Sequence, residues 1–312
     1  MRAAWLVLAI AFALGAAGAV AALQPLPDAA NRLELTWGAD SILSARLDGA
    51  THELVLLKGD VDVLGDQTRA TLAAVAQANQ ASLTAARSVG GSAVASIETR
   101  QTNLDGLLGC SGWSDAFRHT LTQTYNTALV ERYHDICLAI ASVAPLEADW
   151  QSLVAGSQTA MQVAADIDGH DQVAAAALQL ATEGRYPDAL AKLSEATARI
   201  TDATAIATNE SKTADVSTLT SWLSRTTTMD QALATLWNTM IASKGRVTSQ
   251  VTAALKNVNS AKALLPDSNA VLQIVLHELA SRMTGSGISI ETARGALAVA
   301  VADLTAKASP GQ

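Results

Sequence analysis

The chain has 312 residues, enough for one large or two ordinary domains with a sizeable buried core. Hydrophobic residues make up 49% of it but aromatic residues only 4%, so a core this poor in rings indicates closely packed helices and argues against a β-sandwich or barrel. The net charge is −8 and the sequence has no basic block. This argues against nucleic acid as a partner, because binding phosphates requires clustered cations.

The N-terminal residues 1–23 predict export or anchoring. An uncharged apolar run, Trp5–Leu23, follows Arg2 and ends near the small residues Ala19-Val20-Ala21. This pattern fits a secretory signal peptide with cleavage near Ala21, and the run is also close to the ~20 residues that span a bilayer. We therefore expect either a cleaved signal or a retained membrane anchor, followed by a linker over 24–39. In both cases the rest of the chain is extracytoplasmic and contacts the membrane only through this segment.

Regular apolar spacing predicts a long coiled-coil-like helix over residues 40–109. Steps of four and three, the heptad pattern of a helix seam, join Leu43, Leu47, Ala50, Leu54, Leu57, Val61 and Leu64. The line then recurs every 11 residues, at Leu64, Val75, Ala86, Ile97 and Leu108, which predicts a nearly straight stretch. We expect one helix, or two in tandem, with bends at Gly59, Gly65 and the pair Gly90-Gly91. A β-hairpin over 32–63, turning at Asp48-Gly49, is the alternative.

A second long helical element is predicted over residues 188–265. Heptad steps run from Leu190 to Ala207 and again from Leu233 to Leu265, with Lys244 on the second line. A break is expected at 209–215. The two long elements have matched lengths, so we expect them to pair antiparallel, ~100 Å long if each is fully helical.

The remaining segments predict shorter helices. Region 110–187 should contain helices at 113–122, 128–142, 147–165 and 173–182. Region 266–312 should form a hairpin of two helices, 268–284 and 290–307, that turns at Gly285-Ser286-Gly287. The sequence therefore predicts an all-α fold, an elongated helical bundle of long antiparallel coiled-coil-like helices and shorter helical hairpins.

The chain has two cysteines, Cys110 and Cys137. An exported protein with an even number of cysteines is expected to form a disulfide. The segment 122–127 is poor in helix formers, and a break there would let its two arms bring the sulfurs together. Two buried free thiols or an intermolecular bridge are the alternatives to an intrachain bond.

The densest polar cluster is a candidate metal site formed by Asp166, Asp168, His170 and Asp171. Its spacing does not match a calcium-binding loop, since Gly169 stands at the fourth place and Ala177 at the twelfth. In the alternative interpretation Gly169 ends one helix and Asp171 caps the next. The sequence predicts no cofactor.

The sequence shows no motif for a catalytic nucleophile, a phosphate loop or a dinucleotide site, so we expect a protein that is not an enzyme. The leading hypothesis is an extracytoplasmic helical scaffold or interaction protein that binds a protein partner or itself. One alternative is a carrier that holds an apolar ligand between Ala-rich helices. The other is a metal-dependent enzyme built on the acidic cluster at 166–171.

Overall fold

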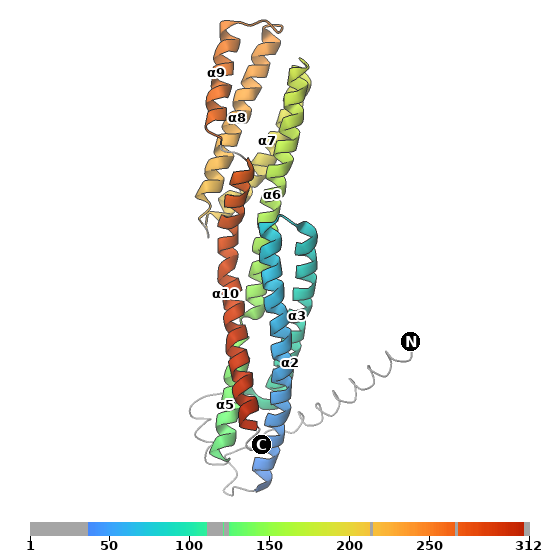
Figure 1. Cartoon of the computed structure of the whole chain (residues 1–312), viewed down its shortest axis with the longest axis vertical. Coiled ribbons are helices and arrows are strands. Elements are labelled where there is room, and N and C mark those ends of the chain that lie inside the picture. The colour runs from blue at the N-terminus through green and yellow to red at the C-terminus, as the bar shows by residue number, and fades with distance from the viewer. Residues whose placement is uncertain (1–36, 111–120, 122–124, 213–214, 266–267, 309–312) are drawn as a thin grey trace, which may run out of the picture. The chain divides into compact units, whose positions relative to one another are not determined.

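The structure is a computed structural model that describes residues 37–110, 121, 125–212, 215–265 and 268–308. Every regular element in these ranges is a helix, which confirms the all-α helical prediction (Figure 1). The N-terminal segment 1–23 lies outside the described residues, as does nearly all of the helix predicted at 113–122. None of the helices described here is both long and apolar enough to cross a membrane.

The described residues divide into two compact units. The first unit lies within residues 37–68, 88–150 and 287–308, and the second lies within 69–87 and 151–286. The unit boundaries fall inside helices, so four helices contribute residues to both units.

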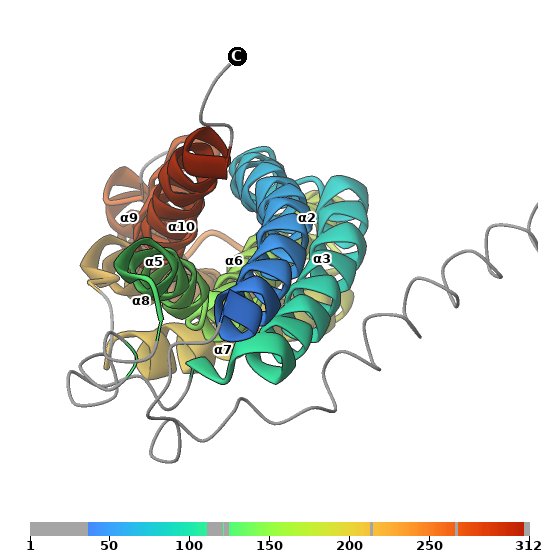
Figure 2. The same cartoon turned by 90° about the horizontal axis from the view of Figure 1, so that it is seen from below.

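The first unit contains most of α2 (Trp37–Ala76) and α3 (Gln80–Leu108), which lie side by side in Figures 1 and 2. The guanidinium of Arg100 on α3 forms ion pairs with Asp60 and Glu53 on α2. Only three residues connect these neighbouring helices, so they run antiparallel. Helix α2 continues through Asp48-Gly49, so the β-hairpin alternative is wrong over residues 37–63.

The predicted seam is the buried face of α2 and α3. Each residue of the heptad line is at most 3% exposed, at Leu43, Leu47, Ala50, Leu54, Leu57, Val61 and Leu64. The 11-residue line is equally buried, at Leu64, Val75, Ala86, Ile97 and Leu108. Burying a leucine side chain of this size contributes about 2 kcal/mol. The line nevertheless crosses a break at 77–79 that was not predicted, where Ala78 adopts a φ of 49°. The bends predicted at Gly59, Gly65 and Gly90-Gly91 do not interrupt the helices.

The first unit also contains α5 (Thr127–Ser142), as predicted, and the C-terminal half of α10 (Ser268–Ala308), which lies beside α5 in Figure 2. The side chain of Asn126 caps α5 by accepting a hydrogen bond from the N–H of Ala128 at 2.9 Å. Cys110, directly after α3, forms the predicted disulfide with Cys137 on α5, and their Cα atoms are 5.3 Å apart.

In the second unit, α8 (Ser217–Ala242) packs against both α7 (Tyr186–Glu210) and α9 (Ser249–Ala263) (Figure 1). The break expected at 209–215 separates α7 from α8. The helix predicted to continue through Lys244, on a heptad line with one four-four slip, is wrong there, because the chain turns. Lys244 has a φ of 53° and Gly245 a φ of 75°, and Thr248 caps α9 with its side chain. Region 188–265 therefore forms three helices, with α8 packed against the other two, in place of the expected long helical element.

Two further helices are longer than predicted. Helix α6 (Leu146–Thr182) joins the two helices expected at 147–165 and 173–182, so Gly169 does not end a helix and Asp171 does not cap one. Helix α10 likewise continues through Gly285-Ser286-Gly287, so the predicted C-terminal hairpin is wrong. At both places the helix continues through glycine, whose unfavourable helix propensity amounts to only about 1 kcal/mol.

Candidate functional site

The clearest candidate site is a pocket of about 660 Å³ in the second unit, between the α2–α3 turn and one face of α6. The α6 residues that line it include Gln158, Met161, Ala165 and Asp168, at steps of three, four and three. This spacing places them along one side of the helix. Met161 and Ala164 are buried and form the floor, while the polar side chains stand at the open edge.

One end of the pocket holds Arg87, which is half-buried on α3. With the Gln158 amide oriented so that its oxygen faces Arg87, this oxygen accepts hydrogen bonds from Nη1 at 2.8 Å and Nη2 at 2.7 Å. The Nε of Arg87 is buried and makes no hydrogen bond. A guanidinium is always charged and has five N–H donors, so one neutral oxygen leaves both its charge and several of its donors uncompensated.

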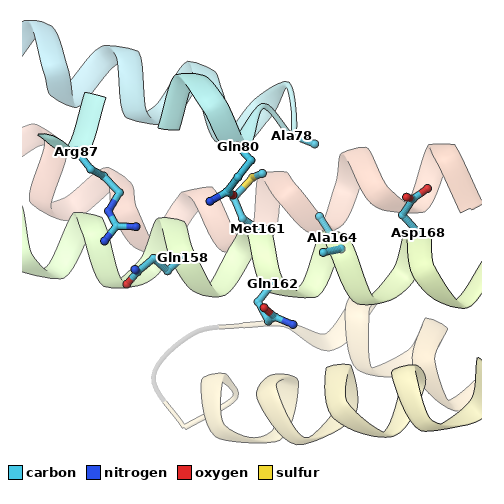
Figure 3. A pocket seen from close by; sticks show the side chains of 9 residues that line it. Ala78, Gln80, Arg87, Gln158, Met161, Gln162, Ala164 and Asp168 are labelled. Atoms are coloured by element: carbon cyan, nitrogen blue, oxygen red, sulfur yellow. The ribbon is translucent and has the colours of Figure 1, made fainter. Parts of the chain in front are cut away.

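The other end of the pocket holds the exposed carboxylate of Asp168. Its Oδ2 accepts a hydrogen bond of 2.7 Å from the amide of Gln172, which is also neutral. Figure 3 shows Arg87 pointing from α3 toward Gln158, with Asp168 at the opposite end of this stretch of α6. The side chain of Gln80 enters from the start of α3, near Met161 (Figure 3). The pocket thus has a cation and an anion at opposite ends, and neither is paired with an opposite charge in the described residues.

The structure places the four predicted metal ligands on consecutive turns of α6, and they face different partners. Asp166 is buried, accepts a hydrogen bond from Gln162 at 3.1 Å and lies 3.7 Å from Arg199. Asp168 lines the pocket, and His170 lies in the core of the second unit. Within the described part of the chain, no three histidine, cysteine or acidic side chains are grouped so that they could hold a metal ion.

His170 belongs instead to a buried polar cluster. Its Nδ1 lies 2.9 Å from Asp171, and its Nε2 lies 3.4 Å from Asp230 on α8. The hydroxyl of Thr197 on α7 lies 3.0 Å from the second oxygen of Asp230. Burial alone would lower the pKa of His170, but its hydrogen bonds and charge interactions with Asp171 and Asp230 raise it to about 9. This cluster joins α6, α7 and α8 through buried polar contacts, which gives it a structural role.

The first unit has a smaller groove of about 310 Å³ between α5 and α10. Its apolar edge consists of Leu138 and Val299, which are 55% and 63% exposed, and Asp135 and Asp303 also line it.

Comparison with protein-family models, with curated proteins and with solved structures finds no match for this chain.

The sequence did not single out Arg87 and Gln158, although it did identify Asp168. Arg87 directly follows Ala86, a residue of the buried 11-residue line. A charged residue beside the core was thus the one feature of the sequence that could have pointed to Arg87. Its partner lies on a different helix, and no local spacing relates the two residues.

Proposed function

We propose that this protein is a helical interaction protein that acts outside the cytoplasm, exported or anchored through its N-terminal segment, and that binds a polar ligand without catalysing a reaction. The observation that carries the proposal is the pocket between α3 and α6, in which Arg87 and Asp168 have only neutral partners. Leaving a half-buried charge without a counter-ion is unfavourable, so a ligand of opposite charge would bind there with a gain.

The lining of the pocket favours binding over catalysis. Apart from Asp168, its polar groups are the guanidinium of Arg87 and the amides of Gln80, Gln158 and Gln162. These groups keep the same protonation state at neutral pH and are weak nucleophiles, so they hold a ligand and do not transfer protons. The same polar groups favour a polar ligand over the apolar ligand of the alternative hypothesis.

The Cys110–Cys137 disulfide supports the proposed location, because disulfides form and persist mainly in oxidising compartments. The location is tested by fractionating cells that express the full chain with a C-terminal tag and labelling free thiols without reduction. We expect the tagged protein outside the cytosol, with both cysteines unreactive. Cytosolic protein with two reactive thiols would overturn the location.

Binding is tested by measuring the melting temperature of the purified protein with a panel of solutes. The panel contains dicarboxylates, diamines, free amino acids, short peptides and fatty acids. We expect a polar class to raise the melting temperature of the wild type, and to do so far less in an Arg87→Met, Asp168→Asn double variant. A rise with fatty acids alone, equal in both proteins, would contradict the proposal and favour the apolar carrier.

A further inference from the structure

The charge separation in the α3–α6 pocket sets the length of the ligand. Arg87 contacts Gln158, so Gln158 gives the position of the positive end along α6. Gln158 and Asp168 are ten residues apart on this helix, which corresponds to a rise of ~15 Å. An extended peptide advances by about 3.3–3.6 Å per residue, so four or five residues cover this distance. A free amino acid or a dipeptide is too short to reach both charged ends.

The chemistry of the two ends sets the ligand's direction. Nη1 and Nη2 of Arg87 each keep one N–H beyond the two that bind Gln158, and because these point away from each other, a ligand carboxylate would accept from one of them while its charge pairs with the guanidinium. Asp168 already accepts one N–H from Gln172 and retains further lone pairs for an ammonium group. The ligand therefore carries its anion toward Arg87 and its cation toward Asp168.

The middle of the pocket suits a peptide main chain. The amide of Gln80 offers both a donor and an acceptor, as each peptide group requires. The remaining lining residues between the ends are Gln162, whose amide donates to Asp166, and four residues with small or flexible apolar side chains, Ala78, Met161, Ala164 and Ala165. Such a surface leaves room for a peptide main chain with small side chains and does not select for particular side chains of the peptide.

We infer that the pocket binds a short free peptide of four or five residues in extended form, with its C-terminal carboxylate on Arg87 and its N-terminal ammonium at Asp168. This inference rests on the proposed function and names its ligand class. If the solute panel shows that another polar class binds and peptides do not, the inference fails while the proposed function stands.

The test is calorimetric titration of the full chain with tetra-alanine and with its blocked forms. Each chain end makes charge-assisted hydrogen bonds, so we expect C-terminal amidation or N-terminal acetylation to weaken binding about 10- to 100-fold. Di-alanine should bind as weakly as the singly blocked peptides. Equal affinity for the free, amidated and acetylated peptides, or no binding of tetra-alanine at millimolar concentration, would overturn the inference.

Variants assign each end of the peptide to its residue. In Arg87→Met the free and amidated peptides should bind equally, and in Asp168→Asn the free and acetylated peptides should bind equally. Lys256→Met is the matched control, since it removes one exposed positive charge of the second unit outside the pocket and should leave all affinities unchanged. If Arg87→Met still discriminates the amidated peptide, the assignment is wrong.

A second variant keeps the test informative if Arg87→Met does not fold. Gln158→Glu has almost the same shape as the wild type and would give Arg87 a carboxylate partner within the protein. We expect it to raise the melting temperature and to weaken free tetra-alanine about tenfold or more, because the internal carboxylate replaces the ligand's. Unchanged peptide affinity in a folded Gln158→Glu protein would contradict the inference.

Discussion

The indole of Trp150 lies against the Cα of Gly90 so closely that a β-carbon at Gly90 would be 2.1 Å from Cζ2 of the ring. Trp150 is 4% exposed and its ring is held in the core of the first unit. Gly90 therefore allows α3 to approach the start of α6 closely. The sequence had suggested that this glycine bends the helix, but α3 is continuous there.

Gly90→Ala should destabilise the protein by about 1–3 kcal/mol, because the added methyl would overlap the buried ring of Trp150. The neighbouring Gly91→Ala is the control. Gly91 is exposed, nothing lies within 4 Å of an added β-carbon, and alanine there should stabilise α3 by up to about 1 kcal/mol. Urea unfolding of both variants checks the pair, and a stabilising Gly90→Ala would show that Trp150 can move.

Arg132→Lys should cost about 1–2 kcal/mol although it keeps the charge. Arg132 on α5 binds three groups of α2, with Nη1 2.7 Å from Asp48 and Nη2 2.8 Å from Thr51 and 3.3 Å from the carbonyl of Leu47. A lysine has no fork and cannot bind all three at once. Arg185→Lys is the control, because this exposed arginine pairs with Asp188, three residues away on the same helix end, and its replacement should leave urea unfolding unchanged. Equal behaviour of the two variants would show that the charge alone matters at Arg132.

The buried faces of the helices were predictable, because apolar periodicity directly reports which side of a helix is covered. The line from Leu43 to Leu64 is buried at every predicted position. The ends of the helices were not predictable in the same way. The chain breaks at Ala78 and turns at Lys244, two residues without turn propensity, yet it stays helical through Gly169 and Gly285. Packing over a whole helix face outweighs the ~1 kcal/mol preference of a single residue.

The candidate site was less predictable than the fold. Asp168 was identified as part of a polar cluster, but as a metal ligand, and the structure groups His170 with Asp230 from another helix. Arg87 meets Gln158 only because the α2–α3 turn ends beside α6 in the second unit. Such a meeting depends on where a helix ends, which is the feature that the sequence specified least.

Replacing both cysteines, Cys110→Ser with Cys137→Ser, should lower the free energy of unfolding by about 3–4 kcal/mol in the chain-entropy description of a disulfide. The bond closes a loop across 27 positions of the chain, and that loop restricts the unfolded state. Chemical unfolding with and without a reductant provides the measurement. Reduction should destabilise the wild type by the same amount and leave the double variant unchanged, and a wild type insensitive to full reduction would contradict the prediction.

The His170 cluster should make stability fall in alkaline solution. Burial favours the neutral imidazole, but the hydrogen bonds to Asp171 and Asp230 outweigh it and raise the pKa of His170 to about 9 in the folded protein. The unfolded value is about 6.5, so the folded state binds the proton more tightly. The cluster's contribution is therefore complete below pH ~6.5, declines as the pH rises, and is lost once the pH passes through the folded pKa of about 9.

This dependence can be isolated with His170→Gln, which keeps an uncharged hydrogen-bonding side chain that does not titrate. We expect the wild type to exceed the variant by on the order of 2 kcal/mol at pH ~6 and by little at pH ~9.5, measured by urea unfolding across that range. Titrations of other groups affect both proteins alike and cancel in the difference. A difference that stays constant across the range would show that His170 is neutral in the fold, and that Asp230 is held by Thr197 without a buried cation.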